Sequence, residues 1–498
     1  MQRKQLTLVI VSLLVVVLSV SLAWFTTQII GKGKTVDVSS ANLQIVFTDS
    51  DGALTETDIE PGWQKTKTFT IKNDTKTEYK YNIVIKDLLN TFVTEGYLQY
   101  KITSTNNGYN MTEFKDIPKS SIATDTILAY SVSIPVGVTQ SYTIEFKYAN
   151  DESVDQSDDM GRKLSGTLFI TEGTEEPVTL LSQMLADKTT RPGARTSFSS
   201  TLTSNNTKTL YTSTENGTTV YYFAGNATDN WVKFGKNASN QDLYWRIIRT
   251  NSDGSVRLLY HGTSTTATDA YIGESEFNSN GDNIAYVSYM FGSTGSISNA
   301  RENTTNSTIK TTIDNWYKTN LNTNYGKYLS TTAIYCNDRT YTVSGSNTYF
   351  GAYTRLITNK TPSYDCSATE DKFTVDKSTG NGKLTYPIAL MTADEVSFAG
   401  GVWNKYALTW YYKNSVNVNG SSTGSTWWWL LSPSDWDRGI AYVFLVYGSN
   451  DPGHLSNRAV NSAYGVRPAI SLKSCTLYST GNGSASAPYT IKETTSGC

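Results

Sequence analysis

The stretches "WWWLLSPS" (Trp427–Ser434) and "GVRPAISL" (Gly465–Leu472) frame the part of the chain that decides its fold. Consecutive residues of a strand point to opposite faces, so at least one of the three tryptophans must be buried. We therefore interpret the tryptophans as structural. Arg467 precedes a proline, and we expect it to anchor the end strand through hydrogen bonds to carbonyl groups.

The segment between these stretches alternates in character. In "IAYVFLVYG" (Ile440–Gly448), residues at odd positions share one strand face and residues at even positions share the other. If the smaller Ala441 and Val443 pack inward, then Tyr442 and Phe444 belong to an aromatic stripe that faces solvent.

Farther along, Leu455 and Val460 fit buried positions, and polar or aromatic residues surround them. Tyr, Trp, Arg, Ser and Asn dominate adaptable binding surfaces, since aromatic side chains give a large contact area at a small entropy cost. The competing interpretation is that Tyr and Phe on strands belong to the core. We predict a recognition surface made of Asp435, Trp436, Asp437, Arg438, Tyr442, Phe444, Val446, Tyr447, Asp451, His454, Ser456, Asn457, Arg458, Asn461, Ser462 and Tyr464.

The sequence before this segment mixes strand and helix signals. "LYWRIIRTNSDGSVRLLYHG" (Leu243–Gly262) predicts a β-hairpin, because Asp-Gly in its turn supplies positive φ angles. Apolar residues recur at helical spacing from Ile309 to Leu321 and predict an amphipathic helix capped at Asn306 or Ser307.

A second helix signal lies in "YPIALMTADEVSFAGG" (Tyr386–Gly401). Thr392 and Glu395 have the spacing of a capping box, and two glycines end the helical pattern. A few helices among many strands predict an α+β domain over residues 210–475, with a tail of residues 476–498 packed on it.

Four motifs in this order, "YWRIIR", "LMTADEVSFAGG", "WWWLLSPS" and "GVRPAISL", resemble a family of bacterial surface domains with a C-type-lectin-like fold. The resemblance covers about Leu210 to Leu472. It implies an ordinary secreted module or a variable protein of a diversity-generating retroelement, in which adenines are mutated and Asn codons diversify. Changes in the first two bases of an Asn codon cannot give Lys, Glu, Gln, Met or Trp. Residues 434–464 contain none of the first four, whereas Trp436 departs from this pattern.

Catalysis is not expected. A related branch of this fold includes oxidases that generate formylglycine with a reactive cysteine pair, but no cysteine lies within residues 434–464. Of the two histidines, we interpret His261 as a satisfied turn residue, and neither it nor His454 has an acidic companion in the local sequence to orient it as a base. Calcium-binding signatures of sugar-binding lectins are missing as well. We expect no enzymatic activity, no cofactor and no metal ion.

The first residues predict export. Gln2-Arg3-Lys4 precedes an uncharged run from Leu6 to Phe25, long enough as a helix to cross about 30 Å of hydrocarbon. Residues 1–33 are therefore expected to be a membrane anchor, or a signal peptide cleaved after Ala23. "SLAWFTTQIIGKG" (residues 21–33) resembles the export signals of camelysin-like and biofilm-fibre proteins of Gram-positive bacteria. Either outcome places the remaining chain outside the cell, anchored at its surface or secreted.

The cysteines allow two interpretations. They are free or buried thiols, or they form two local disulfides. An oxidising extracellular compartment favours the disulfides. The pairs would be Cys336 with Cys366 and Cys475 with Cys498.

Residues 34–172 alternate apolar and polar residues between turns, as in "TKTFTIKN" (Thr66–Asn73), and predict an antiparallel all-β sandwich. "EPGWQKTKTFTIKNDTKTEYKYNIVI" (Glu60–Ile85) resembles bacterial surface domains of immunoglobulin-like shape, which implies a stalk or spacer. Residues 173–209 predict a linker, with a short helix after Pro177 and then a stretch rich in Gly, Pro, Ser and Thr that packs poorly.

Charge excludes one class of partner. Lys and Arg number 42 against 44 Asp and Glu, so the chain has no basic field for nucleic acid. We predict a cell-surface ligand-binding protein, an adhesin or receptor, that binds a protein or glycan on another cell, phage or host surface. The alternative is a structural subunit of an extracellular matrix or fibre without a diversified site.

Overall fold

The computed structural model describes residues 34–39, 44–49, 54–56, 59–94, 96–267, 270–412, 427–448, 453–495 and 497–498. The predicted export segment, residues 1–33, and the candidate contact residue Asp451 lie outside this part. Among the described residues, no helix combines the length and the apolar character needed to cross a membrane.

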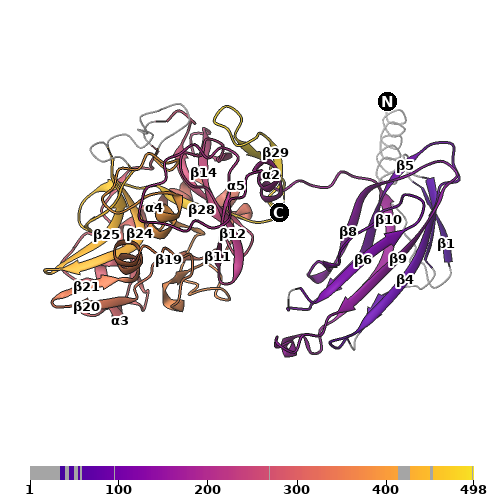
Figure 1. Ribbon diagram of the computed structural model, residues 1–498, viewed down its shortest axis with the longest axis horizontal. Helices are drawn as coiled ribbons and strands as arrows, with labels where there is room; N and C mark the ends of the chain where they lie inside the picture. Colours follow the sequence, from indigo (N-terminus) through magenta and orange to yellow (C-terminus); the bar gives the residue numbers. More distant parts are fainter. Residues whose placement is uncertain are drawn as a thin grey trace, which may run out of the picture. The chain divides into compact units, whose positions relative to one another are not determined.

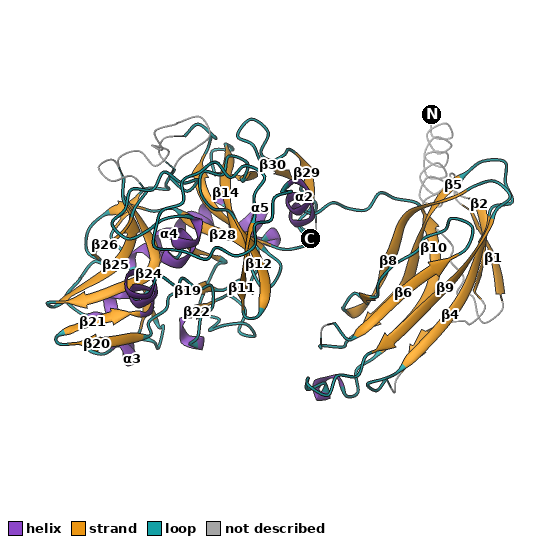
Figure 2. Ribbon diagram, in the orientation of Figure 1, coloured by secondary structure: helices purple, strands orange, loops and turns teal. Residues whose placement is uncertain are grey.

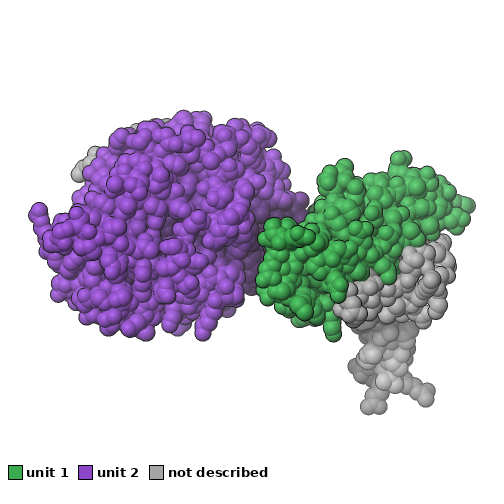
Figure 3. Space-filling view, turned by 60° about the horizontal axis from the view of Figure 1, so that its bottom comes forward, with its two compact units in different colours: residues 1–176 green, residues 177–498 purple. Residues whose placement is uncertain are grey.

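The chain divides into two compact units, Met1–Glu176 (unit 1) and Pro177–Cys498 (unit 2), coloured separately in Figure 3. Both units are built mainly of strands in several sheets, with few helices (Figures 1 and 2). A multidomain, mostly β chain is therefore shown.

Unit 1 consists of two antiparallel sheets packed around one core. The first has the order β1 (Lys34–Ser39), β2 (Gln44–Asp49), β4 (Gln64–Lys72), β9 (Thr139–Tyr148), β6 (Leu98–Ser104), β7 (Lys115–Asp116). The second has the order β3 (Leu54–Glu56), β10 (Leu164–Glu172), β5 (Tyr79–Asn90), β8 (Ser120–Ile134). Every second residue of β9, from Gln140 to Tyr148, is buried, as the period-two pattern predicts. A short 3-10 helix, η1 (Ser157–Asp159), precedes β10.

The largest sheet of unit 2 has nine strands. Its main path has the order β23 (Ile388–Leu390), β28 (Pro468–Leu472), β15 (Val256–Gly262), β14 (Asp242–Thr250), β13 (Trp231–Lys236), β30 (Tyr489–Ile491), β29 (Tyr478–Thr480). β12 (Thr218–Tyr222) pairs with β14 and with β11 (Tyr211–Glu215). Residues 476–498 thus contribute two strands to this sheet.

A second sheet of unit 2 has seven strands, of which several are labelled at one end of the unit in Figure 1. Its path has the order β16 (Glu274–Ser275), β27 (Tyr464–Gly465), β24 (Trp428–Asp437), β21 (Asn347–Phe350), β20 (Tyr341–Ser344). β25 (Ile440–Val446) pairs with β24 and with β26 (Leu455–Ala459). Two small ladders join β17 (Met290–Phe291) to β18 (Thr305–Asn306) and β19 (Tyr335–Cys336) to β22 (Lys372–Phe373).

The helices of unit 2 are short. The α-helices are α2 (Leu180–Asp187), α3 (Ile297–Ala300), α4 (Thr308–Asn320), α5 (Asn322–Tyr325), α6 (Gly351–Tyr353) and α7 (Ala393–Ala399). The remaining helical turns are η2 (Ile284–Val287), η3 (Gly326–Tyr328), η4 (Thr354–Asn359) and η5 (Thr369–Asp371).

Several local predictions are confirmed. β14 and β15 form the expected hairpin. The Ser307 side chain caps α4 by accepting a hydrogen bond from the Lys310 backbone. Thr392 and Glu395 form the expected capping box of α7, which ends at Gly400 with φ of 119°.

The structure corrects the predicted linker. From Pro177 onward the chain belongs to unit 2, and α2 buries Leu180 and Met184 in the main core. Arg195 then donates to the carbonyl groups of Ser397 and Phe398, at 2.9 and 3.0 Å. A stretch rich in Ser, Thr and Gly can therefore pack when its backbone and arginines find partners, which composition does not reveal.

Candidate functional site

The predicted surface centres on the antiparallel strands β24, β25 and β26. Residues that pair directly across an antiparallel ladder share a face. The register pairs Asp435 with Tyr442 and Tyr442 with Ala459, while β21 places Tyr349 opposite Asp435. Residues from two distant parts of the sequence therefore meet on one face of this sheet.

The predicted solvent-facing stripe is wrong for Phe444 and Val446, which are fully buried. Trp403 packs edge-on against Phe444, with ring centroids 5.9 Å apart, and its segment forms a bridge with Leu455. On the opposite face, the side chains of Ala441, Val443 and Leu445 are fully buried as well. The sheet is covered on both faces, so of the stripe only Tyr442 stays half-exposed.

The other predicted contact residues differ in exposure. Asp435, His454 and Ser456 are buried, which corrects their placement at the surface. Arg438 and Asn461 are exposed. The half-buried set comprises Trp436, Asp437, Tyr442, Tyr447, Asn457, Arg458, Ser462 and Tyr464.

Part of this set packs on itself. Trp427 stacks on Tyr447 at 4.1 Å and on Tyr464 at 5.2 Å between centroids. The Arg458 guanidinium lies over Trp427 and Tyr447, at 4.6 and 4.7 Å. These rings bury much of their surface against one another, so we assign this stacked cluster mainly to the scaffold of the domain.

A different group of residues surrounds the buried Asp435 and is otherwise half-buried. We call it the aromatic–acidic face: Tyr349, Tyr353, Trp403, Asp435, Asp437, Tyr442 and Asn457. The ring centroids of Tyr349 and Tyr353 are 4.5 Å apart, and those of Tyr353 and Trp403 are 6.4 Å apart. All three rings are half-buried. The sequence argument missed them because β21, α6 and the 402–405 segment lie far from residues 434–464. One signal was available. Neighbouring residues of a strand point to opposite faces, so a buried Phe350 places Tyr349 on the outward face.

Asp435 is the chemically unusual member of this face. Its Oδ1 accepts hydrogen bonds from the Ser434 hydroxyl and the Asn457 amide, both at 2.6 Å. Burial raises the pKa of Asp435, those hydrogen bonds lower it, and the Asp437 carboxylate raises it. Burial also raises the pKa of Tyr353, and Asp435, Tyr349 and Asp437 add to that rise. The tyrosine hydroxyl and the two carboxylates therefore share one electrostatic environment.

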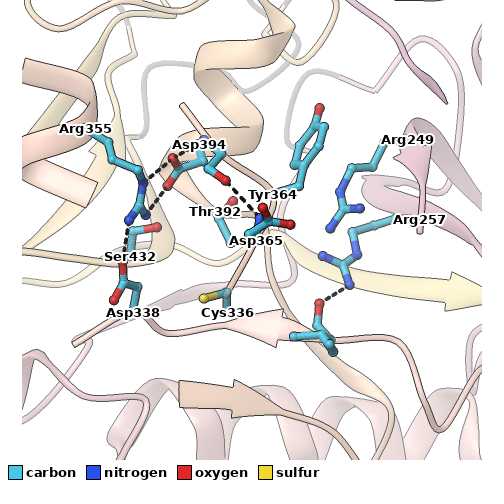
Figure 4. A pocket seen from close by; sticks show the side chains of 12 residues that line it. Arg249, Arg257, Cys336, Asp338, Arg355, Tyr364, Asp365, Thr392, Asp394 and Ser432 are labelled. Carbon is cyan, nitrogen blue, oxygen red and sulfur yellow. Dashed lines mark hydrogen bonds and ion pairs between the residues drawn. The ribbon is translucent and has the colours of Figure 1, made fainter. Parts of the chain in front are cut away.

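Figure 4 shows a second candidate, a polar pocket beside Cys336, with Arg355 between Asp338 and Asp394. Arg355 binds both oxygens of Asp394 at 2.9 Å and Asp338 at 2.5 Å. The pocket has room for roughly one water molecule. It is too small for an organic ligand, and its charged side chains already pair with one another. We therefore assign it to the scaffold.

Glu395 pairs with two other arginines that line the pocket. Arg249 and Arg257 each contact its Oε1 at 2.8 Å. Burial works to raise the pKa of Glu395, but the two arginines hold it below its ordinary value. Arg249 also binds Glu215 at 2.8 Å, so these charges balance one another inside unit 2.

Two further predictions concern single residues. Arg467 donates to the carbonyl oxygens of Tyr260, at 3.1 and 3.2 Å, and of Tyr411, which confirms it as an anchor. His261 is not a satisfied turn residue, because neither ring nitrogen has a hydrogen-bond partner among the described residues. Its ring packs against Trp231 at 4.4 Å. Burial and then the charges of Arg467 and Arg246 lower the pKa of His261.

The structure contains the disulfides Cys336–Cys366 and Cys475–Cys498. In the part of the chain that the structure describes, no group of three or more His, Cys, Asp or Glu side chains has the arrangement of a metal site.

One family model matches the chain. It is described as a domain of unknown function, DUF6273, and it matches residues 305–474. This range contains β20 to β28 and hence the aromatic–acidic face. No curated protein and no solved structure matches the chain.

Proposed function

We propose that this protein is an extracellular, cell-surface ligand-binding protein, an adhesin or receptor, whose second unit is a C-type-lectin-like domain. The aromatic–acidic face is its docking surface. The observation that carries this proposal is the group of half-buried rings, Tyr349, Tyr353, Trp403 and Tyr442, gathered beside the largely buried strands β24 and β25. Rings held by a packed frame are pre-ordered for contact and lose little entropy on binding.

The frame beneath this face favours binding over a passive role. β24 buries Trp428 to Asp435, and β25 buries Ala441 and Val443 to Val446. Binding sites on strands hold their side chains more precisely than sites on loops. Unit 1 then serves as an immunoglobulin-like spacer, and the two disulfides suit an oxidising exterior.

The turn between β24 and β25 supports a diversified surface. Arg438 and Gly439 have φ angles of 49° and 82°. Positive φ at both central positions defines a turn in which Asn-Gly is the favoured pair. Arginine is poorly suited to this conformation, yet a change in the first two bases of an Asn codon produces it. We propose that residues 434–464 vary between copies of the gene.

The genomic test of diversification is direct. A reverse-transcriptase gene beside this one, with a near-copy of the segment that carries Asn codons at exposed positions such as 438, is the expected finding. Related strains that keep identical residues at all exposed positions of this segment would contradict it.

Attachment assays test the docking surface. Cells that display the full chain are compared with cells that display the variant Tyr349→Ser/Tyr353→Ser/Tyr442→Ser. We expect attachment to target cells to fall at least tenfold with the same amount of protein displayed. The control Ile122→Ser/Met160→Ser changes exposed apolar residues of unit 1. Equal attachment by the face variant, together with filaments in electron micrographs, would favour the fibre subunit.

A further inference from the structure

Asp435 stands apart from the other buried carboxylates of unit 2. It is 7% exposed, and no Lys, Arg or His among the described residues lies within ion-pair distance of it. The other buried carboxylates in the described part of unit 2 all pair with a cation: Glu215, Asp229, Asp314, Asp338, Asp371, Asp394 and Glu395. A buried charge without a partner is unfavourable. Among the described residues of unit 2, Asp435 is therefore a buried carboxylate kept without the cation that neutralises the others.

Only one of the two carboxylate oxygens of Asp435 accepts hydrogen bonds from described residues. Both neighbouring donors, from Ser434 and Asn457, bind Oδ1, and no described residue donates to Oδ2. The nearest cationic side chain in the sequence, Arg438, is 89% exposed and lies 3.9 Å from Asp437. A strong acceptor therefore stays open beside a second carboxylate.

The aromatic side chains around Asp435 complete a site for a cation. Tyr349 lies directly opposite Asp435 in the ladder between β21 and β24. The rings of Tyr349 and Trp403 flank Tyr353, at 4.5 and 6.4 Å between centroids. Aromatic faces attract ammonium groups, and the attraction grows where water is excluded. Carboxylates and aromatic rings together thus select positive charge.

We propose that the aromatic–acidic face binds a lysine side chain of a protein partner, with the ammonium group on Asp435 and Asp437 and the methylenes against the rings of Tyr349, Tyr353 and Trp403. This inference rests on the proposed function and names the chemistry of its ligand. A long, unbranched chain that ends in a charge can reach a carboxylate that is almost fully buried. The amine of an amino sugar sits directly on a bulky ring and reaches less deeply.

Saturation-transfer NMR on the full chain in detergent micelles tests this directly. The probe is Nα-acetyl-lysine N-methylamide, and the matched control is the norleucine analogue, which lacks only the ammonium group. We expect saturation of the lysine methylenes and at least tenfold weaker binding of the norleucine compound. Equal binding of the two compounds, or no binding of either, would overturn the proposal. Binding of glucosamine without binding of lysine would also overturn it, in favour of an amino glycan.

The variant Asp435→Asn separates binding from folding. It keeps the shape and the acceptor oxygen while removing the charge, so lysine binding should fall at least tenfold with an unchanged or higher melting temperature. Glu493→Gln removes an exposed charge of unit 2 and should change neither property. A loss of melting temperature in Asp435→Asn with full lysine binding would assign Asp435 to the frame alone.

The dependence on pH gives an independent readout. Asp437, Tyr349, Tyr353, the cross-strand neighbour Tyr442 and the exposed Arg438 are the titratable groups around Asp435. Lysine stays protonated below pH 9, so its binding should be lost as Asp435 takes up a proton, at a pH above the ordinary range of aspartate. If attachment needs the face but lysine does not bind, this inference fails while the docking function stands.

Discussion

At the scale of single residues, the stability of unit 2 depends on which buried charges have partners. Glu395 joins Arg249 and Arg257, each at 2.8 Å, and its Oε2 accepts the backbone N–H of Thr392. Removing one member of such a group leaves the others buried and unpaired. The spacing of Thr392 and Glu395 predicted the cap, but the two arginines come from strands more than a hundred residues earlier.

The variant Glu395→Gln keeps the cap geometry and removes the charge that both arginines share. We expect it to lower the free energy of unfolding by about 3–5 kcal/mol, the range for breaking a buried ion pair. Urea denaturation followed by circular dichroism measures this value. A change below about 1 kcal/mol would mean that water reaches these guanidinium groups.

Arg438 provides a stabilising prediction. Its φ of 49° lies in the left-handed region, where asparagine is better tolerated than arginine. Arg438→Asn should therefore raise the free energy of unfolding by about 0.5–1 kcal/mol. Thermal melting of the two proteins at one ionic strength checks it, and Arg458→Asn, on a strand, should give no gain.

His261 predicts how stability depends on pH. Its pKa lies well below 6.5 in the folded chain, mainly because the ring is buried. Below about pH 6.5 the unfolded chain binds a proton that folded His261 does not, so the free energy of unfolding falls, by up to about 1.4 kcal/mol per pH unit. His261→Phe should flatten the melting temperature between pH 6.5 and 5 and leave the slope above pH 7 unchanged. An ordinary histidine titration of the folded protein by NMR would refute this.

At the scale of elements, periodicity predicted the strands and caps well, because these depend on neighbours in the sequence. It did not predict which side of β25 faces solvent. The face that carries Phe444 is covered by Trp403, about forty residues upstream, and the side chains of Ala441, Val443 and Leu445 on the other face are buried too. The alternation of residues in the sequence separates the two faces of a strand. Which of these faces is exposed depends on the other strands, helices and loops that pack against it.

The two aromatic residues of β25 should therefore behave differently. Phe444→Ala removes a fully buried ring and should cost about 3–5 kcal/mol of unfolding free energy. Tyr442→Ala removes a half-exposed ring and should cost less than about 1.5 kcal/mol while weakening attachment. Chemical denaturation of both variants decides it, and equal losses would show that Tyr442 also belongs to the core.

At the scale of the whole molecule, the boundary between the units follows packing and not composition. Residues 177–209 look like a linker, yet they add Leu180 and Met184 to the core of unit 2 and bond to the end of α7. A fragment of residues 177–498 should unfold in one cooperative transition at the melting temperature that this unit has in the full chain. A fragment of residues 210–498 loses both buried side chains, each with about 2–5 kcal/mol of stabilisation, and should melt far lower or fail to fold. Scanning calorimetry separates the outcomes, and equal melting of the two fragments would return residues 177–209 to the role of a linker.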